Sequence, residues 1–116
     1  MARDDVIATE FLSLAEKKRR QACKVAEIRE ALIALGFDSI TTQAKVLGLS
    51  RSTTWAILQR PHKASGLSAT IIKRMLASQN LPPNVRQIIE EYVHEKSLGA
   101  YGHGPKQRGN FRAQLG

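Results

Sequence analysis

The stretch AKVLGLSRST, residues 44–53, decides the fold that we predict for this chain of 116 residues. Ala44 is small enough to allow two helices to cross closely. Gly48, four positions later, allows a tight turn, because a positive φ costs glycine little. Ser50 can then cap a second helix by accepting hydrogen bonds from its first free amides. The stretch therefore predicts two short helices joined by a glycine turn.

The flanking residues set the expected limits of these two helices. Ser39 can cap the first helix, which we expect over residues 40–47. Pro61 stops the second helix, expected over residues 51–59, because proline disfavours a helical conformation in the residue before it. A helix, a glycine turn and a second helix are the layout of a DNA-binding helix-turn-helix.

Apolar residues predict which side of this motif faces the core. Leu47, Leu49 and Ile57 are expected to point inward and to hold the two helices against the rest of the protein. Thr54 also takes an inward position, where a larger aliphatic residue would be more usual. Its methyl group can pack, but its hydroxyl needs a partner, for which a carbonyl one turn back is suitable.

The opposite side of the second helix is expected to be exposed and to contact DNA. It carries short or polar side chains that can approach base edges: Arg51, Ser52, Trp55, Ala56 and Gln59. Arg51 and Gln59 can make paired hydrogen bonds to a purine. For Trp55 two interpretations stay open, packing on a neighbouring helix or donating its indole N–H to the sugar-phosphate backbone.

From about residue 25 to residue 93 the chain resembles the lambda-repressor-like, Cro-type helix-turn-helix family of phage and bacterial regulators. The matching residues are Ala44, Leu47, Gly48, Leu49, Ser50, Ser52, Thr53 and Ile57. The resemblance implies an all-α fold, a compact five-helix bundle whose third helix docks in the major groove. It also implies a homodimer, formed through the last helix at about residues 84–97. Gln43 departs from the family pattern, which often has an aliphatic residue before the small alanine.

The resemblance also implies roles for individual residues. By motif position, the base readers would be Arg51, Ser52, Ala56 and Gln59. The residues against phosphates would be Thr41, Thr42, Ser50 and Thr53. Trp55, Arg60 and Lys63 complete the set that we expect to bind double-stranded DNA.

The distribution of charge supports a polyanionic partner. The net charge is +8, and residues 36–80 hold six Lys/Arg against the single acid Asp38. A surface that contacts only solvent would not require one region to be almost free of acidic residues. The basic run over residues 17–20 is different, because acids flank it on the same predicted helix, and we interpret it as a solvated face.

The remaining segments divide the chain into three expected parts. Residues 1–20 form a helical N-terminal extension, residues 21–98 the DNA-binding domain, and residues 99–116 a basic, Gly-rich flexible tail. Helical character is continuous from about residue 4 to residue 35, with Asp4 or Asp5 as the expected cap. One long helix and two helices with a break near residues 18–21 both fit this segment. The expected apolar stripes of the helices are Val25, Ile28, Leu32 and Leu35, then Ile71, Ile72, Met75 and Leu76, and finally Val85, Ile88, Ile89, Tyr92 and Val93.

The tail has two interpretations that composition does not separate. Lys106, Arg108 and Arg112 alternate with Tyr101 and Phe111 and could follow phosphates or enter a minor groove. Alternatively, the segment is an unstructured end that keeps the protein soluble.

The sequence offers little support for catalysis or for a bound cofactor. The three histidines lie far apart, Cys23 is the single cysteine, and no metal-ligand spacing or phosphate-binding glycine loop is present. We therefore expect no enzyme, no cofactor, no metal and no small-molecule ligand. The lone cysteine fits a reducing compartment, and no apolar run approaches a membrane span, so we expect a cytoplasmic protein, associated with the nucleoid if bacterial.

Two other functions stay open at this point. One is a small helical adaptor or oligomerisation module, such as an antitoxin-like partner that docks through the N-terminal segment. The other is a DNA packaging or recombination accessory factor that binds duplex DNA with little sequence preference.

Overall fold

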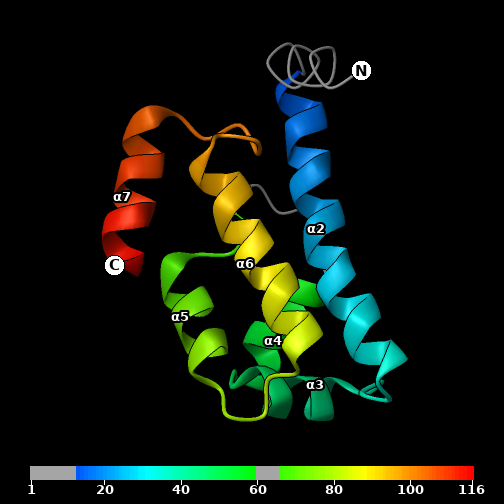
Figure 1. The fold of residues 1–116 in the computed structure, drawn as a ribbon. Coiled ribbons are helices and arrows are strands. Elements are labelled where there is room, and N and C mark those ends of the chain that lie inside the picture. Colours follow the sequence, from blue (N-terminus) through cyan, green and yellow to red (C-terminus); the bar gives the residue numbers. More distant parts are fainter. Residues whose placement is uncertain (1–12, 60–65) are drawn as a thin grey trace.

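The computed structural model describes residues 13–59 and 66–116, and these residues form helices without any strand (Figure 1). The helices are α2 (Leu14–Ala34), α3 (Ile40–Leu47), α4 (Arg51–Gln59), α5 (Ala69–Ala77), α6 (Pro83–Ser97) and α7 (Pro105–Leu115). The all-α prediction is confirmed for this part of the chain. The first five helices correspond to those expected from the sequence, and α7 is an addition to them.

Helix α2 begins where Ser13 accepts a hydrogen bond from the amide of Glu16 at 3.2 Å. It then runs to Ala34 without a break, so the expected border between residues 20 and 21 falls inside a helix. The expected caps Asp4 and Asp5 lie outside the described residues. Gly36 follows the helix with a φ of +94°, as expected for a glycine that ends a helix.

Three of the four residues expected to form the apolar stripe of α2 lie in the core. Val25, Ile28 and Leu32 are at most 1% exposed. The prediction for Leu35 is wrong, because this residue is 47% exposed. Leu35 stands at the C-cap, where the backbone leaves the helical path, and the partly buried Phe37 packs against the core instead.

Helix α6 lies beside α2 and packs against it more extensively than any other helix pair in the described residues (Figure 1). Val85, Ile89 and Tyr92 are fully buried between the helices. An ion pair of 2.6 Å between Lys24 Nζ and Glu91 Oε1 joins the two helices at their edge. The apolar stripe of α6 is therefore part of the protomer's core, as its periodicity predicts, and among the described residues α7, not α6, is the last helix.

The prediction of a flexible tail is wrong. Residues 105–115 form α7, which packs against α5 and α6. Tyr101, which precedes α7 in the sequence, is fully buried, and Phe111 of α7 is 6% exposed. Pro105 suits the first turn of a helix, and the side chain of Gln107 accepts a hydrogen bond from the Gly104 amide at 3.1 Å. Burial of the two aromatic rings offsets the weak helical propensity of this Gly-rich segment.

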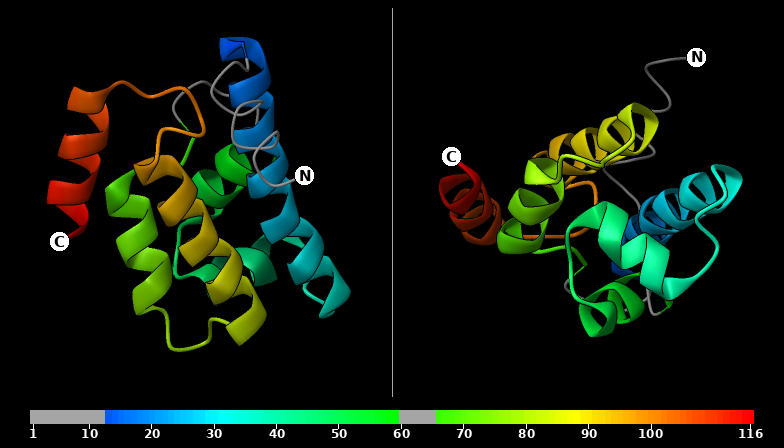
Figure 2. Two further views of the ribbon diagram at one scale, coloured as in Figure 1. Left: turned by 45° about the horizontal axis from the view of Figure 1, so that its top comes forward. Right: turned by 90° about the horizontal axis from the view of Figure 1, so that it is seen from below.

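The motif helices α3 and α4 lie together at one end of the molecule, away from the connection between α6 and α7 (Figure 1). Seen from that end, α3 and α4 are nearest the viewer, with α2 and α6 behind them (Figure 2). Leu47 of α3 and Leu58 of α4 pack in the hydrophobic core and so connect the two helices to the rest of the protein. The fold thus presents the motif at the periphery of the bundle.

Candidate nucleic-acid interface

The turn between α3 and α4 has the geometry expected from its glycine. Gly48 adopts a φ of +72°, and the amide of Leu49 donates to the carbonyl of Ala44 at 3.0 Å. A Cβ on Gly48 would lie 3.2 Å from the Cβ of Ser78 at the end of α5. The Ser78 hydroxyl in turn donates to the carbonyl of Val46 at 2.7 Å. Both the positive φ and the close approach of α5 therefore favour glycine here.

The two serine caps of the motif are confirmed. Ser39 Oγ accepts from the amide of Thr42 at 3.2 Å, and Ser50 Oγ accepts from the amide of Thr53 at 3.1 Å. The Ser50 hydroxyl also donates to Thr53 Oγ1 at 2.8 Å. These caps fix where each helix begins, and so they fix the direction in which α4 leaves the turn.

The inner face of α4 is anchored by Thr54 and Leu58. Thr54 is fully buried, and its hydroxyl donates to the carbonyl of Ser50 at 2.8 Å, which is the partner one turn back that the sequence predicts. Leu58 is 2% exposed, whereas Ile57 is only partly buried. Leu58 therefore takes the main anchoring position in the second turn, where the sequence pattern predicts Ile57.

The outer face of α4 is open to solvent. All five residues expected there are exposed: Arg51, Ser52, Trp55, Ala56 and Gln59. Trp55 is 46% exposed, a large fraction for an indole ring. The four residues that the resemblance implies as base readers, Arg51, Ser52, Ala56 and Gln59, are thus all accessible on α4.

The threonines at the start of α3 are exposed as expected. The Thr42 hydroxyl already donates to the carbonyl of Ser39 at 3.0 Å, so it takes part in capping the helix, while Thr41 has an exposed side chain. Gln43, the departure from the family pattern, is 2% exposed and donates from Nε2 to the carbonyl of Phe37 at 2.9 Å. Its amide holds the segment between α2 and α3 in place. Arg60 and Lys63 lie outside the described residues.

A buried polar cluster holds the segment that leads into α5, and sequence analysis missed it. The Tyr92 hydroxyl accepts from the amide of Leu67 at 2.8 Å and donates to Gln21 Oε1 at 2.8 Å. Lys96 Nζ donates to the carbonyl of Leu67 at 2.7 Å. The one indication of this cluster in the sequence is that polar residues fall on the faces of α2 and α6 that also carry the apolar stripes. The cluster positions both backbone polar groups of Leu67, eight residues after the end of α4.

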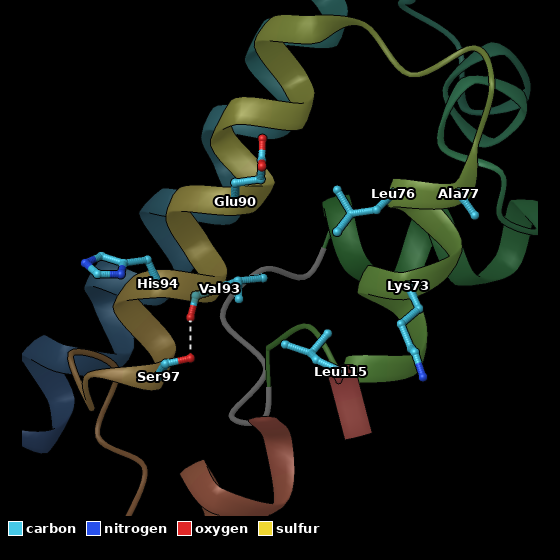
Figure 3. A pocket seen from close by; sticks show the side chains of 8 residues that line it. All are labelled: Lys73, Leu76, Ala77, Glu90, Val93, His94, Ser97 and Leu115. Carbon is cyan, nitrogen blue, oxygen red and sulfur yellow. Dashed lines mark hydrogen bonds between the residues drawn. The ribbon is translucent and has the colours of Figure 1, made fainter. Parts of the chain in front are cut away.

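An apolar groove lies between α5 and α6 and is closed at one end by Leu115 of α7 (Figure 3). Its volume is about 800 Å³, and Leu76 and Val93 face it from its two sides. The exposed residues Lys73, Glu90 and His94 stand at its rim. These groups do not form a nucleophile with a positioned base.

Within residues 13–59 and 66–116, no three His, Cys, Asp or Glu side chains gather closely enough to hold a metal ion. None of the helices in the same ranges is long and apolar enough to cross a bilayer.

Comparison of the chain with protein-family models, with curated proteins and with solved structures finds no match. The resemblance to lambda-repressor-like regulators therefore depends on the motif residues alone.

Proposed function

We propose that the protein binds double-stranded DNA by placing α4 in the major groove. The observation that carries this proposal is the division of α4 into two faces. Thr54 and Leu58 are buried, while Arg51, Trp55 and Gln59 are exposed. A helix held in this way can enter the groove without disturbing the core.

The charge of the motif region favours a nucleic acid over a protein partner. Lys45, Arg51, Lys73 and Arg74 are all exposed, and Asp38 is the single acid in residues 36–80. A surface with this balance attracts phosphates and releases counterions when it binds them. Arginine and glutamine on the exposed face of α4 add groups that can distinguish bases.

In this mechanism the phosphate contacts fix the position of the protein and α4 supplies the sequence information. Ser50 and Thr53 at the start of α4 provide hydroxyl groups for the backbone, and Arg51, Ser52, Ala56 and Gln59 contact base edges. We further propose that the protein acts as a transcriptional regulator by occupying an operator, as in the lambda-repressor-like family.

Selection of bound sequences from a random duplex pool, followed by affinity measurements across a salt series, tests this function. We expect an enriched site, and a two-fold symmetric site with half-sites about 34–36 Å apart would indicate a dimeric regulator. Binding that depends steeply on salt and is not improved by any selected sequence would replace the proposal with the accessory factor. An absence of binding at low salt would replace it with the protein adaptor.

A further inference from the structure

The apolar groove of Figure 3 is a surface that the proposed function does not use. Its walls are α5 and α6, and Leu115 of α7 closes one end. The lining that the described residues supply comes from these three helices and not from α4. A ligand of the groove would therefore leave the exposed face of α4 free.

The floor of the groove is apolar. Leu76 and Val93 face it from its two sides, and both are only partly buried although they pack against the core (Figure 3). The Ser97 hydroxyl, which also lines the groove, donates to the carbonyl of Val93 at 2.8 Å, so its proton is already engaged. Covering Leu76 and Val93 would release water from apolar surface, and this favours an apolar occupant.

The chain itself shows what kind of element covers α5 and α6. Helix α7 contacts both of them, and its inward residues are Phe111, which is 6% exposed, and the partly buried Leu115. These two residues are four positions apart, so they lie on one face of the helix. Leu115 stands at the end of the groove, and the groove continues the surface on which α7 packs. A second helix with apolar residues at the same spacing would extend this packing.

The rim of the groove carries opposite charges on its two walls. Lys73 is exposed on α5, whereas Glu90 is exposed on α6, with His94 one turn further along the same wall. An occupant is therefore oriented as well as attracted, because an acidic flank belongs beside Lys73 and a basic flank beside Glu90. Apolar groups between these two flanks meet Leu76 and Val93.

We propose that the apolar groove binds an amphipathic helix of a partner protein. This helix carries apolar residues four positions apart, an acidic residue on the flank toward α5 and a basic residue on the flank toward α6. Insertion of the apolar face of a helix into a groove is a recurring mode of recognition, with anchors three or four residues apart. The groove volume of about 800 Å³ leaves room for several apolar side chains.

Two designed peptides of about four helical turns test the charge pattern. Both carry leucines four positions apart; the mixed peptide has glutamates on one flank and lysines on the other, and the basic peptide has lysines on both. Each peptide is labelled with a fluorophore and titrated with the full chain without DNA, while anisotropy is recorded. We expect saturable binding of the mixed peptide, about fivefold tighter than that of the basic peptide. No saturable binding of the mixed peptide would overturn the proposal.

Lys73→Glu makes both walls of the groove acidic and should reverse this preference in favour of the basic peptide. Lys45→Glu is the matched control, because it changes the net charge equally at an exposed position of α3. The control should keep the preference for the mixed peptide. Equal effects of the two substitutions would show that the whole charge of the protein, and not the rim of the groove, selects the peptide, and would overturn the proposal.

Ala77→Trp tests whether the peptide lies in the groove. Ala77 is exposed and lines the groove, so an indole ring there occupies the space of the peptide without disturbing the core. We expect binding of the mixed peptide to weaken at least tenfold. Ala113→Trp, at an exposed position of α7 that does not line the groove, should leave the affinity unchanged. Binding that survives Ala77→Trp would overturn the assignment.

Sedimentation equilibrium of the chain alone identifies a different occupant. A dimer that Ala77→Trp dissociates and Ala113→Trp does not would assign the groove to a second copy and overturn the proposal. The peptide experiments contain no DNA, so their outcome is separate from that of the duplex selection. Peptide binding by a protein that fails to bind duplex DNA would support the groove and refute the proposed function.

Discussion

The hydroxyl of Thr54 donates to the carbonyl of Ser50 at 2.8 Å, from a side chain that is fully buried. This bond satisfies the one polar group on the inner face of α4. It also shows how a threonine can replace an aliphatic residue at this position, since the methyl group packs while the hydroxyl turns back to the helix. Burial of Thr54 and Leu58 turns this side of α4 toward the core, while Arg51 and Trp55 remain exposed.

Arg51→Ala tests whether α4 reads bases. Arg51 is exposed in the first turn of α4, where a guanidinium can make two hydrogen bonds to a guanine. We expect the substitution to cost about 1–3 kcal/mol in binding and to relax preference at one base pair. Affinity measurements on the selected duplex and on its single-base variants check this.

Arg112→Ala is the charge-matched control for that experiment. Arg112 is exposed on α7, which packs on α5 and α6. The Arg112→Ala substitution should leave the preference of the protein among single-base variants of the duplex unchanged. Equal preferences in Arg51→Ala and the unmodified protein would show that α4 does not read the sequence.

Gly48→Ala should destabilise the fold by about 1–2 kcal/mol, because alanine at a φ of +72° is strained and its Cβ crowds Ser78. Gly109→Ala is the matched comparison. Gly109 lies within α7 with no atom within 4 Å of an added Cβ, so this change should stabilise by about 0.5–1 kcal/mol. Urea unfolding monitored by circular dichroism measures both. Effects of the same sign would contradict the turn geometry.

Tyr92→Phe should destabilise the protein by about 1–3 kcal/mol, since the buried amide of Leu67 loses its acceptor. Tyr101→Phe should lower the stability of the protein by less than Tyr92→Phe does. The Tyr101 hydroxyl donates to Glu95, whose side chain is 41% exposed, so water can take over that bond. Thermal unfolding of both variants gives the comparison, and a larger loss for Tyr101→Phe would argue against the importance of the buried cluster.

The pKa of His103 predicts a loss of stability in acid. Burial, Lys96 and Lys18 lower this pKa to about 4 from the usual 6.5, so the native state favours the neutral ring. Between pH 6.5 and pH 4 the unfolded state binds a proton that the native state does not, and stability falls as the pH falls. Urea unfolding at pH 7 and pH 4.5 should show a smaller decrease for His103→Gln than for the unmodified protein. An identical decrease would contradict the shifted pKa.

The helix-turn-helix could be predicted because its signals are local. A serine cap, a glycine with positive φ and an inward threonine each depend on residues within one helical turn. Ser39, Gly48, Ser50 and Thr54 all behave as the sequence indicates. The exposed face of α4 followed from these positions.

Features that depend on distant partners could not be predicted in the same way. The sequence of helix α7 has little apolar periodicity. The position of this helix depends on the packing of Phe111 against Lys96 and the core. The bond between Gln21 and Tyr92 joins residues 71 positions apart. Periodicity carries no information about such pairs.

Helix α4 has nine residues, and two of them, Thr54 and Leu58, are buried. A helix of this length is not stable alone in water, because nucleation is unfavourable and few bonds follow it. A synthetic peptide of residues 51–59 would be a random coil. Anyone who wishes to graft this surface onto another scaffold, or to redesign it, must transfer the supporting helices with it.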